Sequence, residues 1–337
     1  MSGVPEGAVA AAYGLGEPAG AARYAARGEL GRIWRLDTRR GSWAVKESLV
    51  PVREEDARAD VAFQLAAAEA GVRLPRPVRT EDGGDVVFEG RWRVYAWVDL
   101  VPEDEGGRAG AEELGAAAAG VHRVGHPAAG PVAAWFAEPV GRDRWEALTR
   151  RVREAGGGDG GGDGGGDGGG DGGGDGGGGG WRAALTAAVP LLVAAEEVVE
   201  APPPDGLVTC HRDLGPDNVR RAADGGIVVL DWENCGPARP AWELARVLAD
   251  LPDGQAGAAY RAYRDAGGPA RLSGPADFSM AVAEQGHLLE FYARRALAEE
   301  GEEPEENRVR AAARLRAMLR RPLTRARIDS LLTECGG

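Results

Sequence analysis

Alternation of apolar and polar positions marks the first hundred residues as a small β-rich lobe. The segments 33–38 and 43–48 alternate as strands do, and residues 38–41 between them predict a hairpin turn. Further strands are predicted over 78–80, 85–90 and 92–100. We therefore expect a lobe that covers residues 1–98 and ends where the last strand reaches Asp99.

One long amphipathic helix is predicted inside this lobe, over residues 52–70. Val61, Leu65 and Ala68 fall on one face at helical spacing, and acidic residues gather at its start, where the helix dipole favours them. Gly71 follows the last periodic position, as is common after a helix.

Residues 99–337 have a different, mostly helical pattern. Helices are predicted over 111–124, 145–155 and 181–200, short strands over 207–210, 218–221 and 227–232, and further helices from Trp242 onward. Pro190 should kink or split the third helix, because proline lacks the backbone N–H that a helix interior needs. A β-rich lobe followed by a larger helical lobe is an α+β plan.

A low-complexity tract interrupts the helical part at residues 156–180. It contains 20 Gly and 5 Asp in GGGD repeats and no other residue type. Calcium-binding repeats of similar composition also carry an apolar residue in each turn, and none is present here. Glycine loses much backbone entropy when it is ordered, and this tract has nothing to bury. We therefore expect a flexible insertion within the helical lobe.

Composition excludes several classes of function. The 337 residues carry a net charge of −13, which disfavours a nucleic-acid binder because such proteins need a basic surface. No apolar run approaches about 18 residues, and no basic segment precedes an apolar one at the start, so neither a membrane span nor a signal peptide is expected. The three cysteines are scattered, without metal or disulfide spacing. These features favour a cytoplasmic protein in a reducing compartment.

The distribution of basic residues points to one position. Of the 40 basic residues 39 are Arg, and the only lysine is Lys46, on a predicted strand. A lysine retained in such a composition suggests a place where a compact ammonium is needed and a planar guanidinium does not fit. Chance survival is the alternative interpretation.

Chemistry-bearing residues gather between residues 211 and 231. His211, Asp213 and Asn218 form an HxDxxxxN pattern, and Asp231 follows thirteen residues after Asn218 at the end of an apolar strand. Phosphoryl transfer needs one carboxylate to orient or deprotonate the attacking hydroxyl, a role that fits Asp213. It also needs hard oxygen ligands for Mg²⁺, and Asn218 and Asp231 provide them. The grouping predicts transfer of the γ-phosphoryl group of ATP to a hydroxyl.

Three motifs resemble those of the aminoglycoside phosphotransferase and choline kinase-like family, which shares the protein-kinase fold. They are VKE around Lys46, HRDLGPDN at 211–218 and LDWE at 230–233, and the resemblance extends from about residue 28 to 250. It implies a bilobal, protein-kinase-like fold with a small β-rich N-terminal lobe and a larger helical C-terminal lobe.

The resemblance also implies roles for the motif residues. Lys46 would reach the α- and β-phosphates of ATP, Asp213 would be the catalytic aspartate, and His211 would brace the catalytic loop. Asn218 and Asp231 would ligate Mg²⁺.

Further parts of the nucleotide site follow from the same resemblance. Gly28 and Gly31, in GELG, would let a hairpin loop lie over the phosphates. The backbone of Ala96 and Val98 would contact adenine.

Two positions depart from the family pattern. A glutamate on the long helix usually pairs with the lysine; here Asp60 stands at the expected spacing, with Glu55 as the alternative. Arg212 stands where this family usually has glycine, which makes the loop look like that of a protein kinase. A protein substrate is disfavoured, because a helix opens at Pro240, within ten residues of Asp231, and leaves no room for a peptide-docking segment.

The acceptor is less well defined than the phosphate donor. The resemblance makes an aminoglycoside the named candidate, while choline, homoserine, a sugar or another antibiotic stay open. Glu233, next to the metal-binding position, is a candidate for lining the acceptor pocket. A non-catalytic nucleotide-binding pseudokinase is the alternative from another class, although the joint presence of Lys46, Asp213, Asn218 and Asp231 argues against it. The sequence leaves the oligomeric state open.

Overall fold

The chain divides into two compact units, each built from two segments. The computed structural model describes residues 3–29, 31–84, 86–156, 180–298 and 303–336. The first unit comprises residues 1–131 and 204–271, and the second comprises 132–203 and 272–337. These divisions fall at other points than the expected lobe boundary at residue 98, which stays a prediction. The expected flexible insertion lies almost wholly outside the described residues.

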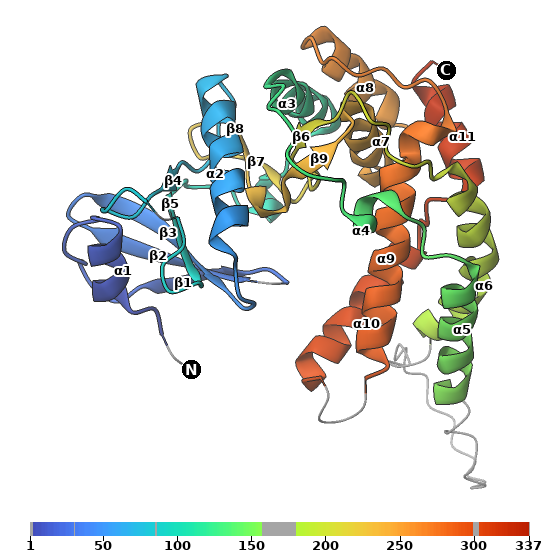
Figure 1. The fold of residues 1–337 in the computed structure, drawn as a ribbon, viewed down its shortest axis with the longest axis horizontal. Coiled ribbons are helices and arrows are strands. Elements are labelled where there is room, and N and C mark those ends of the chain that lie inside the picture. Colours follow the sequence, from blue (N-terminus) through green and yellow to red (C-terminus); the bar gives the residue numbers. More distant parts are fainter. Residues whose placement is uncertain (1–2, 30, 85, 157–179, 299–302, 337) are drawn as a thin grey trace, which may run out of the picture. The chain divides into compact units, whose positions relative to one another are not determined.

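An antiparallel five-stranded sheet dominates the start of the first unit (Figure 1). In spatial order its strands are β1 (Arg23–Arg27), β2 (Gly31–Thr38), β3 (Gly41–Ser48), β5 (Trp92–Ala96) and β4 (Pro77–Val78). The predicted hairpin is confirmed, and its register places Ile33 opposite Lys46. The predicted strand at 85–90 is wrong. The backbone N–H groups of Val86 and Val87 donate to the Glu54 carboxylate (2.9 and 3.1 Å), which takes the place of a neighbouring strand.

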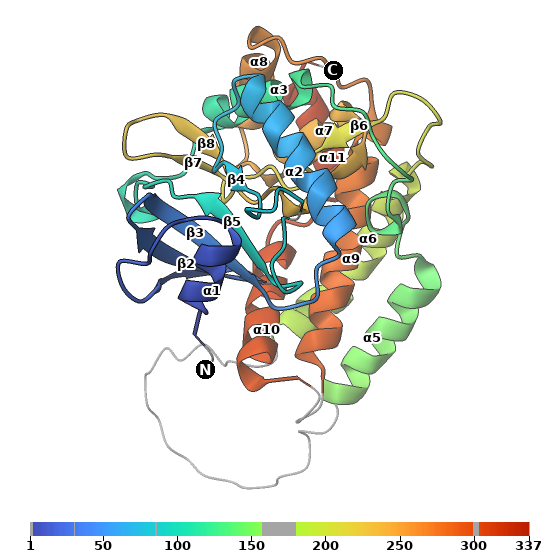
Figure 2. The same ribbon diagram turned by 60° about the vertical axis from the view of Figure 1, so that its left-hand side comes forward.

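One face of this sheet packs on a hydrophobic core, and the other carries Lys46. Leu36, Val45 and Val94 are buried in a core with Val9 of α1 (Glu6–Ala12). Successive side chains of a strand point to opposite faces, so Lys46 lies on the face away from this core. The predicted long helix is α2 (Glu54–Glu69), and both views show it beside β4 (Figures 1 and 2).

The remainder of the first unit carries the HxDxxxxN pattern in the loop that joins two small sheets. Strands β6 (Val208–Cys210) and β9 (Gly236–Ala238) form one antiparallel pair, and β7 (Val219–Arg221) and β8 (Ile227–Val229) form the other. The helices are α3 (Ala111–Arg123), α7 (Pro240–Asp250) and α8 (Ala256–Asp265). Gly115 allows α3 to pack closely on α8, because a Cβ there would lie only 2.0 Å from the Ala259 carbonyl oxygen.

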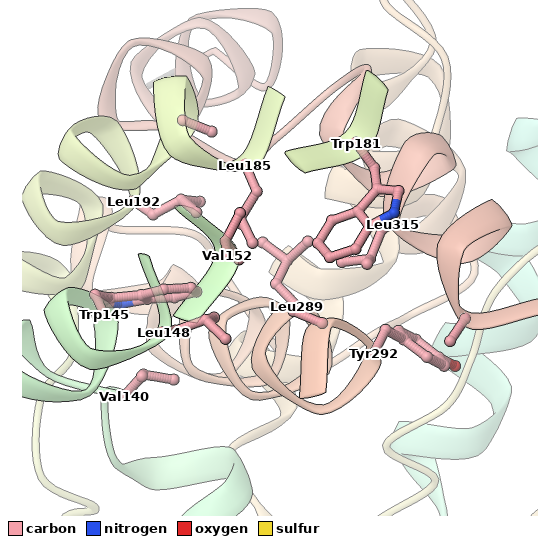
Figure 3. Close-up of a cluster of buried hydrophobic side chains, with 13 residues drawn as sticks. Val140, Trp145, Leu148, Val152, Trp181, Leu185, Leu192, Leu289, Tyr292 and Leu315 are labelled. Atoms are coloured by element: carbon pink, nitrogen blue, oxygen red, sulfur yellow. The ribbon is translucent and has the colours of Figure 1, made fainter. Parts of the chain in front are cut away.

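The second unit is helical. Its helices are α4 (Ala134–Ala137), α5 (Arg142–Gly156), α6 (Gly180–Ala195), α9 (Ser279–Ala296), α10 (Glu305–Leu319) and α11 (Arg325–Glu334). Figure 3 shows the core that α5, α6, α9 and α10 share, in which Trp145 and Leu148 of α5 lie near Leu185 of α6 and Leu289 of α9. A sheet-containing unit and a helical unit together confirm the α+β class. No helix in the part of the chain that the structure describes combines the length and apolarity needed to span a membrane.

Pro190 does not split its helix; a kink, the other outcome expected, stays a prediction. Helix α6 continues through Pro190 to Ala195, and Leu185 and Leu192 on either side of it are buried in the core. Pro190 itself is exposed, so the carbonyl that loses its helical partner lies on the side that meets water.

Replacing residues 157–179 with a four-residue Gly-Ser linker is expected to change the melting temperature by no more than about 3 °C. The ends of α5 and α6 belong to the same core, and loop closure costs change by only about 0.6 kcal/mol per doubling of length. Thermal unfolding followed by circular dichroism, with and without calcium, measures this. A fall of ten degrees, or calcium-dependent stability lost with the tract, would contradict the interpretation as an insertion.

Candidate active site

Lys46 lies beneath Gly31, the first residue of β2. The Gly28 N–H donates to the Gly31 carbonyl (2.9 Å). A Cβ on Gly31 would lie 3.1 Å from both Lys46 Cε and the Glu47 carbonyl oxygen. Glycine at 31 therefore lets the backbone pass directly over the lysine, whereas nothing in the structure restricts position 28 in this way.

The Lys46 ammonium bridges two carboxylates. Its Nζ lies 2.7 Å from Asp231 Oδ1 and 2.8 Å from Glu233 Oε2, and only 16% of the side chain is exposed. Burial alone would lower the pKa of Lys46, but the two carboxylates outweigh it and raise the pKa above its ordinary value. Burial likewise works to raise the pKa of Asp231, and the Lys46 charge outweighs it, so Asp231 is ionised.

The sequence led us to expect an ion pair between Lys46 and Asp60, and the structure does not contain it. Asp60 is buried and faces Arg93 of β5, whose Nη1 lies 3.2 Å from Asp60 Oδ2. Burial raises the pKa of Asp60 to about 7, against the opposing effect of Arg93. The alternative acid, Glu55, is exposed on α2. Arg93, an interior cation that sequence reasoning missed, takes the acid that was assigned to the lysine.

Asp213 is held from two sides. Its Oδ2 accepts from Asn218 Nδ2 (2.9 Å), which also donates to the Asp213 carbonyl (2.8 Å), and its Oδ1 lies 3.1 Å from Arg246 Nη2. Burial raises the pKa of Asp213 to about 6, while Arg246 works in the opposite direction. The carboxylate is therefore mainly ionised at neutral pH and fixed in one orientation, ready to accept a hydrogen bond from a hydroxyl.

His211 lies behind this loop as a fully buried brace. Its Nε2 lies 2.9 Å from the Leu230 carbonyl, and its Nδ1 lies 3.3 Å from the Asp213 backbone nitrogen. A carbonyl only accepts and an N–H only donates, so the ring is the neutral Nε2–H tautomer. Burial lowers the pKa of His211 and keeps it neutral. The contacts fit the bracing role that was expected for it.

The residues assigned to Mg²⁺ fit a hard cation. The Leu230 N–H donates to the Asn218 carbonyl (2.8 Å), which joins the loop to the strand that leads to Asp231. Within the described residues, neither Asn218 Oδ1 nor Asp231 Oδ2 has a hydrogen-bond partner. Two oxygens of the preferred type are thus available on adjoining segments.

The backbone at the expected adenine position is only partly available. The Ala96 N–H donates to the Arg76 carbonyl (2.8 Å), so it is already used. The Val98 N–H has no partner in the ranges that the structure covers and is available to a ligand. Beside it, the Arg35 guanidinium lies 5.0 Å from the Trp97 ring and 3.3 Å from Asp99 Oδ1.

Arg212 occupies a conformation that favours glycine. Its φ is +64°, which explains why the family usually has glycine there. Its guanidinium donates to the carbonyls of Asn234 (2.7 Å) and Cys235 (3.0 Å). A Cβ on Gly236 would lie 2.6 Å from the Arg212 Cζ. Gly236 therefore provides the room in which this arginine fits.

Helix α7 contributes two residues that sequence reasoning missed. Glu243 is fully buried and accepts from the backbone N–H groups of His211 (3.2 Å) and Arg212, and it lies 2.9 Å from His122 Nε2. Arg246, one turn later, reaches Asp213 and donates to the Leu214 carbonyl (2.9 Å). The signal in the sequence is an acid within an otherwise apolar stretch of a helix, since such a charge needs partners.

Glu243→Gln is expected to destabilise the protein by about 3 kcal/mol, because it breaks a buried charge network and presents an amide to backbone N–H donors. Urea unfolding measures the loss, with Glu112→Gln on the exposed face of α3 as the control. An unchanged unfolding midpoint would show that Glu243 does not hold the loop.

Comparison with known protein families now identifies the chain. Residues 22–280 match the phosphotransferase enzyme family, APH, and this range covers most of the chain and all three motifs. The chain belongs to this family. A comparison with curated proteins finds no match.

Solved structures of this phosphotransferase class are similar across nearly the whole chain. Spectinomycin phosphotransferase APH(9)-Ia, in complex with ADP and spectinomycin, is 12% identical with a TM-score of 0.66, covering 97% of this chain and 96% of its own. Amicoumacin kinase hAmiN, in complex with AMP-PNP, Ca²⁺ and Ami, is 13% identical with a TM-score of 0.56, covering 93% and 91%. A microcompartment-associated aminopropanol kinase is 15% identical with a TM-score of 0.52, covering 94% and 93%.

At these identities the likeness establishes the fold, so the expected protein-kinase-like class is confirmed. Together with the family match, it makes this protein a small-molecule phosphotransferase, as the motifs predicted.

Proposed function

We propose that this phosphotransferase moves the γ-phosphoryl group of ATP, with Mg²⁺, to a hydroxyl of a small molecule. The observation that carries the proposal is the gathering of four residues in one compact unit: Lys46 pairs with Asp231, Asn218 bonds to Asp213, and the Leu230 N–H links the two pairs through the Asn218 carbonyl. Free cysteines fit a reducing, cytoplasmic location, which stays a prediction.

The residues divide the work by charge and geometry. Lys46, a point charge beneath the Gly31 backbone, would bind the α- and β-phosphates. Asp213, oriented by Asn218 and Arg246, would hold the acceptor hydroxyl in line with the γ-phosphorus and take up its proton. Asn218 and Asp231 would hold Mg²⁺, which when bound neutralises charge on the phosphates. Positioning and charge neutralisation dominate phosphoryl transfer, and these residues supply both.

For the acceptor we propose an aminoglycoside-like molecule. The likeness to a spectinomycin phosphotransferase and an amicoumacin kinase supports an amine-bearing antibiotic, and the net charge of −13 suits a cationic substrate. The aminopropanol kinase keeps a smaller amino alcohol among the alternatives, beside choline, homoserine and sugars.

A screen with γ-labelled ATP over aminoglycosides, amino alcohols and sugars tests the proposal. Label should pass to an aminoglycoside-like compound and depend on Mg²⁺. Transfer to another class would correct the acceptor only. Mg-ATP-dependent thermal stabilisation without transfer to any acceptor would favour the pseudokinase.

A further inference from the structure

Lys46 is held by Asp231 and by the acid two residues after it, and not by an acid of α2. Its two carboxylate partners, Asp231 and Glu233, are separated by one residue, while Asp60 of α2 faces Arg93. We propose that Glu233 is the residue that positions Lys46 for the nucleotide, and that Tyr95 and Arg93 orient Glu233. The inference rests on the proposed function, since it presumes that Lys46 meets phosphates.

Glu233 is fixed by two side chains of β5. Its Oε1 accepts from the Tyr95 hydroxyl (2.9 Å) and lies 3.7 Å from Arg93 Nη1, and its Oε2 binds Lys46. Burial raises the pKa of Tyr95 well above its ordinary value, so the hydroxyl stays protonated and donates a hydrogen bond to Glu233. Only 21% of the Glu233 side chain is exposed. One carboxylate oxygen is thus anchored to the sheet while the other holds the lysine.

The register of the sheet explains why an acid is needed there. Lys46 of β3 and Arg93 of β5 are directly opposite each other, and like charges at such a pair repel. Glu233 binds both cations and so compensates this repulsion. Asp60 binds Arg93 from the helix side, and both side chains are at least 92% buried. Its role is therefore to pair with Arg93, which is a structural one.

Asp231 is less suited than Glu233 to hold the lysine. It is 47% exposed, and the same carboxylate is a proposed ligand of Mg²⁺, so its charge would be shared with a divalent ion. Glu233 is engaged by protein side chains on both oxygens. It is the partner that Lys46 would keep while phosphates and metal bind.

The test compares nucleotide affinity across matched acid-to-amide variants. Binding of AMP-PNP is measured by isothermal titration calorimetry, with Mg²⁺ and again in EDTA. Glu233→Gln is expected to raise the Kd at least tenfold under both conditions. Asp60→Asn should lower the melting temperature but change the Kd less than threefold, and Glu69→Gln, at the exposed end of α2, should change neither.

Tyr95→Phe provides a second, milder variant that keeps the carboxylate and the ring. Removal of its hydroxyl should raise the Kd about threefold while the fold persists, so the proposal stays testable if Glu233→Gln fails to fold. An unchanged Kd in Tyr95→Phe, in that case, overturns the proposal.

Several results would overturn the assignment of Glu233. An effect confined to the Mg²⁺ titration would make it a metal ligand, and an effect on the acceptor KM alone would place it at the acceptor. An equal or larger loss in Asp60→Asn would return the role to α2. Lys46→Met separates a failure of the proposed nucleotide site from a failure of the role proposed for Glu233. If it binds AMP-PNP as the wild type does, the nucleotide site itself is wrong; if it loses binding while Glu233→Gln does not, only this inference fails.

Discussion

Asp213→Asn is expected to lower the rate of phosphoryl transfer by about 10²–10⁴-fold while Mg-nucleotide affinity stays within a fewfold of the wild type. The carboxylate is oriented by Asn218 and Arg246, and it makes no contact with Lys46 in the described structure. An amide at this position keeps the shape but removes the charge that accepts the hydroxyl proton. Steady-state transfer kinetics and calorimetric nucleotide binding measure the two effects separately.

Asp217→Asn is the matched control for this change. Asp217 lies in the same loop, is exposed, and is paired at the surface with Arg108. A surface pair of this kind contributes about 0–1 kcal/mol, so both activity and affinity should persist. If Asp213→Asn reduced nucleotide affinity as strongly as turnover, Asp213 would be a phosphate-site residue and its proposed role would be wrong.

The elements that the sequence predicted well are those whose stability is local. The hairpin around residues 38–41 and the helix α2 follow from period and turn chemistry alone, and the HxDxxxxN spacing places Asn218 next to Asp213 because a tight turn joins them. The strand expected at 85–90 does not form, because the Glu54 carboxylate, far away in sequence, accepts from the backbone N–H groups of Val86 and Val87. Pro190 failed to split α6 because the buried residues around it stabilise the helix.

The charge pairing of the site was beyond the reach of sequence reasoning. Spacing along α2 suggested that Asp60 would meet the lysine, but the partner of a buried charge depends on every cation within reach. Arg93 is brought opposite Lys46 only by the β3–β5 register, and Glu233 is brought to both by the segment after β8. The same holds for Glu243 and Arg246, whose contacts with the catalytic loop depend on how α7 packs.

Lys46→Arg is expected to lower kcat/KM for ATP by roughly 10²-fold, about 2.7 kcal/mol, although arginine serves at every other basic position. The ammonium fits between Asp231 and Glu233 at 2.7 and 2.8 Å, and the Gly31 backbone passes close over its stem. A guanidinium is wider and prefers a bidentate partner, so it would bind one carboxylate side-on and displace its head from the point where the phosphates are bound. Steady-state ATP kinetics measure the loss.

The exchange of one basic residue for the other needs a control at a site without such constraints. Arg39→Lys, in the exposed hairpin turn, should leave both activity and melting temperature unchanged, because its ion pair with Glu17 is exposed to solvent. Circular dichroism should show the Lys46→Arg variant folded, since the positive charge between Asp231 and Glu233 is retained. Near wild-type kinetics in that folded variant would mean that the lysine is an accident of composition, and the placement of the phosphates beside it would have to be abandoned.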